Sequence, residues 1–177
     1  MYQQKMSVYV KHIDTNTLGT DLSNSIHELI RTIPYVKPGY GKSPAGPTKS
    51  TVFSEVKTPQ IRAMPGFDLL EQEIYKQVST MTTGIEFKTC WVNAMYKGAF
   101  VGPHKHDKYG GVAIYYYKVP DNSAKFQYEM NDTFEELEVT EGMLMIHSPT
   151  LMHKVSIHDN EEPRICVVYN FTCDQMF

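Results

Sequence analysis

The stretch Gly98-Ala99-Phe100-Val101-Gly102-Pro103-His104-Lys105-His106-Asp107 is the part of this sequence that indicates the fold most directly. A glycine turn is followed by a short strand that ends in two histidines, His104 and His106. Side chains two positions apart on a strand point the same way, so the two imidazoles can bind one metal ion. Such a pair is also common on a solvated strand face, and by itself it leaves both interpretations open.

A third metal ligand is expected from a distant strand, and His153 fits this role. An apolar strand over residues 143–147 leads through a proline turn to His153, which begins another strand. In a β-barrel wall that strand can lie opposite His104. The other four histidines lack such partners and are interpreted as ordinary surface or core residues: His12, His27, His147 and His158.

The elements around these histidines change character near residue 84. Apolar spacing predicts helices over about 21–33 and 67–81, with a first strand over 5–13, a loop over 34–50 and a strand over 51–56. After Gly84, turn residues separate eight short strands, which are expected over 85–96, 99–104, 111–118, 124–129, 135–139, 143–147, 152–157 and 164–172.

Two helices followed by eight strands predict a mainly β (α+β) fold. The expected architecture is a double-stranded β-helix, or jelly-roll barrel, with two N-terminal helices packed on one face. A length of 177 residues suits one hydrophobic core. We therefore expect a single domain over 1–177, with helical support at about 1–84 and a jelly-roll core at about 85–172.

The composition excludes several classes of protein. Hydrophobic residues make up 41% and charged residues 21%, which is ordinary for a globular chain. The net charge is −3 and the two signs are interspersed, so nucleic acid is not an expected partner. No apolar run is long enough to cross a membrane, and the polar N-terminus favours a cytoplasmic location. Three cysteines without a paired spacing argue against a disulfide framework.

Arg164 raises a second question about the expected barrel. It begins the last strand, where alternation places it on one face with Cys166, Val168 and Asn170. If that face lines the barrel, a buried guanidinium requires an anion, and its planar fork suits a carboxylate. Alternatively, Arg164 lies at the mouth of the strand and pairs with Glu161 or Glu162. The spacing leaves both interpretations open.

Taken together, these motifs resemble the iron(II)/2-oxoglutarate dioxygenase superfamily, in particular its prolyl-hydroxylase-like branch of small oxygenases. The resemblance covers about residues 50–172. The motifs that carry it are Trp91-x-Asn93, Gly98 with Gly102-Pro103-His104-x-His106, Ile114-Tyr115-Tyr116, Gly142 through Pro149 to His153, and Arg164 to Asn170.

The resemblance implies cofactors and roles for particular residues. It implies Fe(II) and 2-oxoglutarate as cofactors, molecular oxygen as co-substrate, and ascorbate as a possible reductant. His104 and His153 would bind the iron, and Arg164 would bind the far carboxylate of 2-oxoglutarate. Three further positions match residues around the co-substrate: Tyr116, Asn93, and Cys166, which stands where the family often has serine.

The chain departs from the family at the middle iron ligand. The family has His-x-Asp, whereas this sequence has His104-Lys105-His106-Asp107. His106 can replace the carboxylate, Asp107 can bind through a one-residue bulge, or the site is inactive. The spacing favours His106, which makes the site one charge unit more positive and alters its iron affinity and redox properties.

The function expected from this resemblance is hydroxylation of a protein side chain, prolyl-like, or of a small amino-acid-like molecule. Two alternatives remain. A cupin-type three-histidine metal dioxygenase would share the histidines but would not use 2-oxoglutarate, and Arg164 argues against it. A non-catalytic jelly-roll binding or structural module would not need convergent histidines at all.

Overall fold

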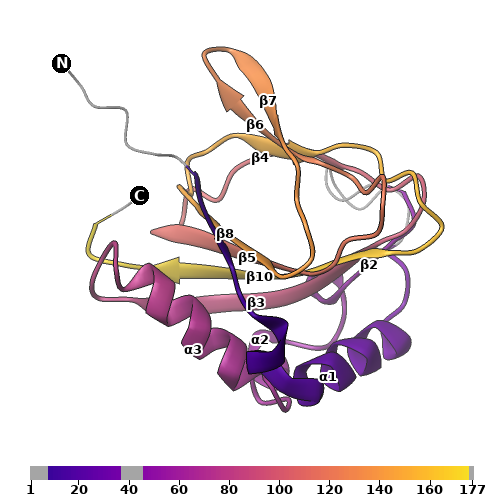
Figure 1. Ribbon diagram of the computed structural model, residues 1–177, viewed down its shortest axis with the longest axis horizontal. Helices are drawn as coiled ribbons and strands as arrows, with labels where there is room; N and C mark the ends of the chain where they lie inside the picture. The colour runs from indigo at the N-terminus through magenta and orange to yellow at the C-terminus, as the bar shows by residue number, and fades with distance from the viewer. Residues whose placement is uncertain (1–7, 37–45, 176–177) are drawn as a thin grey trace.

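The computed structural model describes residues 8–36 and 46–175 of the chain (Figure 1). The helices in these ranges are α1 (Gly19–Thr32), α2 (Thr58–Arg62) and α3 (Phe67–Val78), with short 3-10 helices η1 (Thr15–Leu18) and η2 (Thr51–Phe53). The strands are β1 (Val8–His12), β2 (Thr48–Ser50), β3 (Glu86–Met95), β4 (Val101–His104), β5 (Gly111–Lys118), β6 (Phe126–Met130), β7 (Thr133–Leu137), β8 (Met143–His147), β9 (His153–Val155) and β10 (Arg164–Thr172).

The strands form two antiparallel sheets that face each other (Figure 1). The larger sheet has the order β1-β8-β5-β10-β3-β2, and the smaller has the order β4-β9-β6-β7. Chain neighbours such as β4 and β5 lie in different sheets, as in a jelly roll. The predicted double-stranded β-helix is therefore confirmed, and the eight strands expected after residue 84 are β3 to β10.

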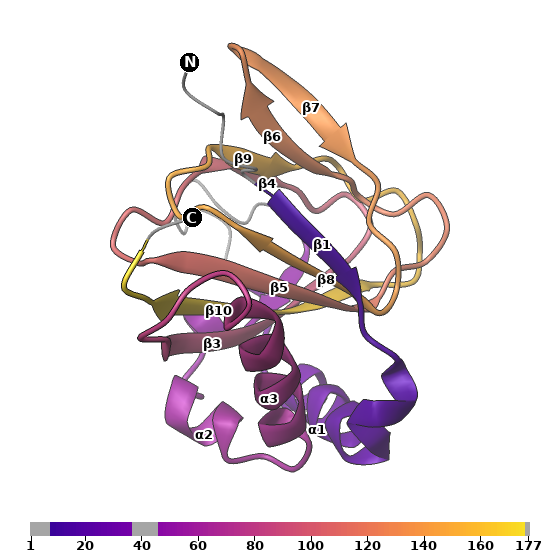
Figure 2. The same cartoon turned by 60° about the vertical axis from the view of Figure 1, so that its left-hand side comes forward.

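The three α-helices cover the outer face of the larger sheet (Figure 2). Alternation along β10 divides its side chains between two cores. Val167 and Tyr169 pack with helix residues such as Ile26, whereas Cys166 and Val168 pack inside the barrel. The helices thus fill one side of the sheet, and the other side is left to line the barrel interior.

The segment before α2 differs from the sequence prediction. The expected strand over 51–56 is wrong, because the strand lies earlier, at β2, and the chain then turns into η2. The hydroxyls of Thr51 and Thr58 accept hydrogen bonds from the backbone N–H groups of Val92 and Cys90, at 3.0 and 3.2 Å. Side-chain hydroxyls therefore satisfy backbone N–H groups at the edge of β3, where a further strand was expected. Helix α2 was not predicted.

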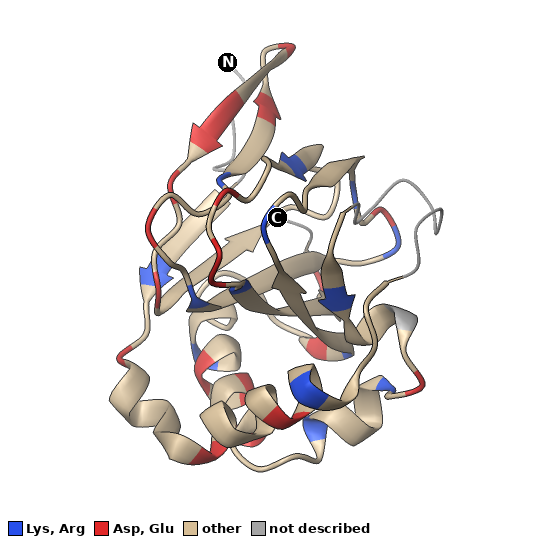
Figure 3. Ribbon diagram, turned by 90° about the vertical axis from the view of Figure 1, so that its right-hand side faces the viewer, with Lys and Arg blue, Asp and Glu red and all other residues tan. Residues whose placement is uncertain are grey.

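Two predictions fall partly outside the described residues. The first strand is present as β1, but its expected residues 5–7 are not described, and neither are residues 37–45 of the expected loop. In the described ranges, the longest helix is α1 with 14 residues, and none is long and apolar enough to cross a bilayer. Figure 3 shows acidic and basic residues interspersed over the outside, with acidic residues along the β6–β7 hairpin.

Candidate metal centre

Two histidines from distant parts of the sequence meet where β4 pairs with β9. These strands are antiparallel, and His104 and His153 are direct cross-strand partners. Opposite residues on paired strands have Cβ atoms about 5 Å apart, which brings the rings together. Their ring centroids are 4.2 Å apart.

His106 lies just beyond the end of β4 and completes the cluster. Its backbone N–H donates to the Pro149 carbonyl at 2.7 Å, which ties this segment to the turn before β9. Its ring centroid is 5.2 Å from that of His104 and 5.3 Å from that of His153. Ligand nitrogens of the three rings all lie within 4.8 Å of one another, close enough to share one metal ion after small side-chain adjustments.

Backbone carbonyls orient two of the three rings. The Nδ1 atoms of His104 and His153 lie 2.9 Å from the carbonyl oxygens of Gly102 and Leu151. Because a carbonyl only accepts, each Nδ1 carries the proton and each Nε2 keeps its lone pair. This is the tautomer that a metal ligand requires, and such outer contacts are typical of metal-binding histidines.

Burial keeps these imidazoles neutral. Loss of solvation lowers the pKa of His104 and lowers that of His106 to about 4. The pKa of His153 is lowered as well, first by burial and then by the neighbouring histidines. At neutral pH all three rings therefore have the uncharged form that binds transition metals.

His147 is a fourth histidine beside this cluster, and no sequence pattern singled it out. It is buried on β8, with its ring centroid 4.7 Å from that of His153. Its Nδ1 donates to the Ser148 carbonyl at 2.8 Å, whereas its Nε2 is buried without a hydrogen-bond partner in the described part of the chain. Strand alternation puts His147 on the same face of β8 as Met143 and Met145. Its position on the barrel side could have been predicted only if the inward face of β8 had been known.

The other histidines have structural roles or lie at the surface, as expected. His158 is buried and links the Ala124 backbone N–H to the Glu162 carbonyl, which fixes a turn. His12 and His27 are exposed.

Arg164 points into the barrel and lacks an acidic partner among the described residues. It is 2% exposed, and its guanidinium lies 4.8 Å above the ring of Tyr116. Its Nη1 donates to the sulfur of Met95 at 3.6 Å, and its Nε has no hydrogen-bond partner within the described ranges. The two glutamates considered as partners pair elsewhere: Glu161 with Lys97 and Glu162 with Lys118. The inward orientation is therefore the correct interpretation of the two.

One cavity joins the histidines to Arg164. Its lining contains all but one of the residues proposed from the sequence: His104, His106, His153, Arg164, Tyr116, Asn93 and Cys166. The exception is Asp107, whose side chain is 53% exposed and pairs with Lys105 at 3.2 Å. Asp107 is therefore separated from the histidine cluster, and the bulged alternative has no support in this structure.

The residues beside Arg164 are polar groups in an apolar wall. Tyr116 is fully buried, its hydroxyl has no hydrogen-bond partner among the residues that the structure describes, and burial raises its pKa. Burial also raises the pKa of the Cys166 thiol, so it is neutral. Asn93 accepts a hydrogen bond from the Ser50 hydroxyl. The region around Arg164 thus combines one cation with neutral donors, which suits an anionic ligand.

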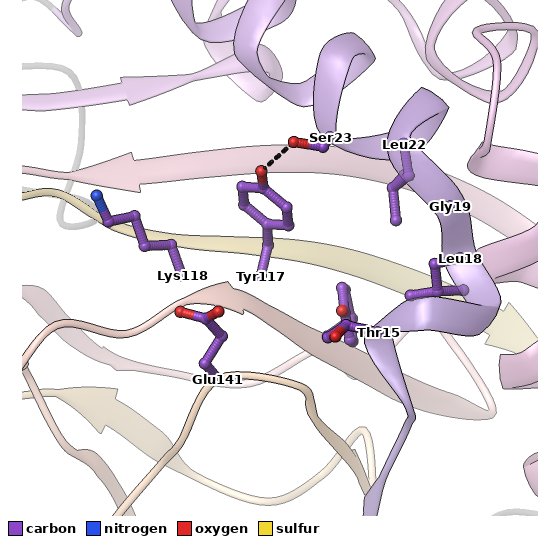
Figure 4. Close-up of a pocket in the computed structure, with 9 residues that line it drawn as sticks. Thr15, Leu18, Gly19, Leu22, Ser23, Tyr117, Lys118 and Glu141 are labelled. Carbon is purple, nitrogen blue, oxygen red and sulfur yellow. Dashed lines mark hydrogen bonds between the residues drawn. The ribbon is translucent and has the colours of Figure 1, made fainter.

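A second hollow, of about 290 Å³, lies on the helical side of the larger sheet (Figure 4). The hydroxyls of Ser23 and Tyr117 hydrogen-bond there at 2.6 Å, which fastens α1 to β5. Lys118 and Glu141 lie at its rim. None of the clustered histidines lines this hollow, so it is separate from the candidate metal centre.

No protein-family model matches the sequence, and a comparison with curated proteins finds no match. Solved structures do match. An oxidoreductase of the 2OG-Fe(II) oxygenase family from Burkholderia pseudomallei is 14% identical, with a TM-score of 0.67 over 96% of this chain and 86% of that chain. A Pseudomonas putida prolyl-4-hydroxylase is 13% identical, with a TM-score of 0.60 over 96% and 94% of the two chains.

HygX from Streptomyces hygroscopicus, solved with nickel and 2-oxoglutarate bound, is 12% identical, with a TM-score of 0.66 over 95% of this chain and 83% of that chain. At such low identity the likeness concerns the fold. This chain therefore has the double-stranded β-helix fold found in the 2-oxoglutarate- and iron(II)-dependent oxygenases.

Proposed function

We propose that this chain is an Fe(II)- and 2-oxoglutarate-dependent oxygenase. The observation that carries the proposal is Arg164, a buried guanidinium without a carboxylate partner among the described residues, in the same cavity as three neutral histidines. An unpaired buried charge is strongly unfavourable, and its planar fork matches a carboxylate. A ligand that binds a metal at one end and presents a carboxylate at the other fits both features.

The residues that line the cavity would have two roles, metal binding and co-substrate binding. His104, His106 and His153 would hold the iron through one nitrogen each, and Arg164 with Tyr116 would hold the far carboxylate of 2-oxoglutarate. Three protein ligands leave room at the metal for the co-substrate and oxygen. When bound, the iron would couple decarboxylation of 2-oxoglutarate to succinate with insertion of one oxygen atom into a substrate C–H bond, and ascorbate would keep it reduced.

His106 is the middle ligand in this proposal. Its ring lies within the nitrogen cluster, whereas Asp107 is exposed and paired with Lys105. A third neutral imidazole leaves the site one unit more positive than a His-x-Asp site. That difference favours binding of the anionic co-substrate and alters the affinity for the metal.

The remaining wall of the cavity would exclude water. Ile114 and Val168 line it from the larger sheet, and Phe126 from the smaller one. An apolar wall strengthens the interaction between Arg164 and a carboxylate, because little solvent screens the charges. The wall would also hold the co-substrate in one orientation.

The proposed primary substrate is a protein side chain, prolyl-like, or a small amino-acid-like molecule. A groove of about 350 Å³ adjoins the metal cavity, with Trp91 lining both and Asn170 at the groove wall. This volume is in the usual range for ligand sites. The likeness to the Pseudomonas putida prolyl-4-hydroxylase supports the prolyl option. If prolyl peptides or free amino acids stimulate succinate release, the compound that does so would identify the substrate class. No stimulation by either would contradict this choice of substrate.

The two alternatives make different predictions about ligands. A cupin-type three-histidine dioxygenase would bind iron without 2-oxoglutarate, and it gives no role to a buried Arg164. A non-catalytic module would bind neither, and it gives no reason for three converging neutral imidazoles. The arrangement of the cavity therefore favours the 2-oxoglutarate oxygenase.

Calorimetric titration of 2-oxoglutarate into the anaerobic, Mn(II)-loaded protein tests the proposal. Arg164→Met should weaken binding by about 2–4 kcal/mol, or about 30- to 900-fold, since a buried charge-assisted pair is lost. Arg62→Met is the matched control, because Arg62 pairs with Glu71 outside the cavity. If the loaded wild type binds no 2-oxoglutarate, or Arg164→Met binds it equally well, the proposal is wrong.

A further inference from the structure

The groove beside the metal cavity carries a charge of its own. Its volume is about 350 Å³, and Trp91 forms part of the wall of both spaces. Among the described residues that line the groove, Lys57 is the only charged one and none is acidic. An uncompensated cation in a groove favours an anionic ligand by charge complementarity.

The hydrogen-bonding groups of the groove favour the same ligand chemistry. The indole N–H of Trp91 and the hydroxyl of Tyr109 have no hydrogen-bond partner in the described ranges. The hydroxyls of Thr51 and Thr89 each accept a hydrogen bond from an N–H group of the protein, which leaves their own protons to donate. Most of the unused groups are therefore donors, and a carboxylate is the acceptor that suits several donors at once.

Asn170 adds a buried acceptor that lacks a donor. It is 4% exposed, and its Nδ2 donates to the Thr89 hydroxyl at 2.9 Å. Its Oδ1 has no hydrogen-bond partner in the part of the chain that the structure describes. An unsatisfied buried oxygen is unfavourable, and a ligand N–H would satisfy it after a small rotation of the amide. A ligand with both a carboxylate and an N–H group therefore matches this lining.

The groove lies away from Arg164 along the inner face of β10. Asn170 is six residues beyond Arg164 on this strand, and a rise of about 3.3 Å per residue separates the two positions by about 20 Å. Trp91 pairs across the strands with Val168, between them, and its ring is nearly parallel to that of His106 at a centroid separation of 6.2 Å. A ligand in the groove would thus be separate from a co-substrate at Arg164, with His106 between the two.

We propose that this groove binds the primary substrate, and that the substrate is a small amino acid whose free carboxylate pairs with Lys57 and whose side chain lies along Trp91 toward the metal. The inference rests on the proposed function and decides between its two substrate options. A residue inside a peptide chain has no free carboxylate to offer Lys57. The Lys57 ammonium donates to the Ser54 carbonyl at 2.9 Å, and no described carboxylate pairs with it.

Intrinsic fluorescence tests the inference without any turnover. Trp91 is the only tryptophan in the sequence, so its emission reports on this wall of the groove alone. Each common amino acid is titrated into the protein, both metal-free and loaded with zinc(II) and 2-oxoglutarate, with calorimetry replacing fluorescence for tryptophan. We expect at least one amino acid to bind, to shift the emission and to protect Trp91 from quenching by acrylamide.

Four matched ligands then locate the groups that the groove recognises. They are the best-binding amino acid, its primary amide, the corresponding acid without the amino group, and the same residue in a peptide blocked at both ends. Removal of the carboxylate or of the amino group should each weaken binding by about 10-fold or more, because charge-assisted hydrogen bonds are lost. The blocked peptide should bind no better than the primary amide.

A lysine substitution assigns the carboxylate to Lys57. Lys57→Gln should weaken binding of the free amino acid by about 2- to 5-fold, the range for an exposed ion pair, and leave the amide unchanged. Lys57 is exposed, so the variant should fold as the wild type does. Lys76→Gln is the matched control, because Lys76 lies on α3, outside the groove, and pairs with Glu73 at 3.6 Å.

The outcomes separate this inference from the proposed function. If 2-oxoglutarate binds the metal-loaded protein but no amino acid binds in either state, only the inference is wrong. A blocked peptide that binds as tightly as the free amino acid would also overturn it, and so would a des-amino acid of equal affinity. If Lys57→Gln leaves the advantage of the acid over the amide intact, the carboxylate lies elsewhere and the proposal is wrong. If the loaded wild type binds no 2-oxoglutarate, the proposed function fails and the inference fails with it.

Discussion

Arg164 occupies a position that is unfavourable for the protein without a bound anion. Its guanidinium is buried, lies over the ring of Tyr116 and donates to a methionine sulfur, and it has no acidic partner among the described residues. Burying a charge without a partner costs several kcal/mol, even after local relaxation. A residue of this kind in a cavity indicates a binding role rather than a contribution to stability.

Substitution of Arg164 by methionine should separate these two roles. We expect the free energy of unfolding of the ligand-free protein to rise by about 1–3 kcal/mol, because an apolar side chain replaces an unpaired charge. Urea denaturation with and without metal and 2-oxoglutarate measures both effects, and the variant should gain no stability from the co-substrate. A loss of several kcal/mol without ligand would mean that the guanidinium holds the fold together.

His106 and Asp107 compete for the same role, and substitution distinguishes them. Asp107→Asn should leave iron affinity unchanged, since Asp107 is exposed and paired with Lys105. His106→Ala should weaken iron binding by more than about 100-fold, the upper range for loss of an outer contact. Anaerobic iron(II) titration monitors both variants. The reverse ranking would make Asp107 the ligand and require the segment after β4 to rearrange.

At the level of single residues, the sequence predicted which side chains line the cavity better than it predicted their hydrogen-bond and ion-pair partners. Strand alternation grouped Arg164 with Cys166 and Val168 but left open whether that face lines the barrel, and the family resemblance supplied the expectation that Arg164, His104 and His153 point inward. Glu161 and Glu162 pair with Lys97 and Lys118 rather than with Arg164, and no local sequence pattern encodes these distant ion pairs. The position of His147 likewise depends on which face of β8 packs inward.

Among the elements, β3 stands out because side chains satisfy part of its edge. Beyond β2, the hydroxyls of Thr51 and Thr58 accept from two backbone N–H groups of β3. Local side-chain hydrogen bonds of this kind compete with regular strand pairing. They let the chain turn into η2 and α2 beside the groove without leaving polar groups of β3 unsatisfied.

Thr51→Val tests this role of the hydroxyl. Valine has nearly the same shape, but the buried N–H of Val92 would lose its acceptor, which should lower the free energy of unfolding by about 1–3 kcal/mol. Urea denaturation provides the measurement, and Thr80→Val is the control, because its hydroxyl bonds a carbonyl at the exposed end of α3. Equal stability of the two variants would show that water replaces the Thr51 hydroxyl.

Elements with a strong pattern were predictable and those set by distant contacts were not. The bounds of β5, β8 and β10 agree with the sequence prediction, since each is an apolar run between turn residues. The β-branched residues after Ser50 favoured a strand, and the tertiary contact with β3 overrode that preference. Pro59 in the first turn of α2 was an available helix signal that the prediction did not use.

In the molecule as a whole, the helices pack against one side of the larger sheet, so the barrel interior is free for the site (Figure 2). One core joins helices and sheet, and a second lies between the sheets. The cavity that the histidines and Arg164 line lies beside this second core. The expectation of a single domain over 1–177 stays a prediction, which limited proteolysis would test.

The buried histidines predict that the metal-free protein is less stable in mild acid. Burial lowers the pKa of His106 to about 4 and that of His147 to about 3, against about 6.5 in an unfolded chain. Below pH 6.5 the unfolded state therefore binds more protons than the folded state, and stability falls until the folded pKa is reached. Each such histidine costs up to about 1.4 kcal/mol per pH unit.

Urea midpoints of the metal-free protein at pH 7 and pH 5 measure this dependence. The midpoint should fall at pH 5, and His147→Asn should reduce the size of the fall, because one buried neutral imidazole is removed. A midpoint that is independent of pH would mean that water reaches these rings and their pKa values are close to normal.

The most direct test of the central claim is an anaerobic iron(II) titration followed by 2-oxoglutarate, observed by visible absorption. Chelation of iron(II) by the keto acid produces a metal-to-ligand charge-transfer band. We expect the band in the wild type, a much higher 2-oxoglutarate requirement in Arg164→Ala, and no band in His104→Ala. Iron binding without the band would instead support a cupin-type metal protein. A wild type that binds no iron would contradict the account and leave a jelly-roll scaffold without this chemistry.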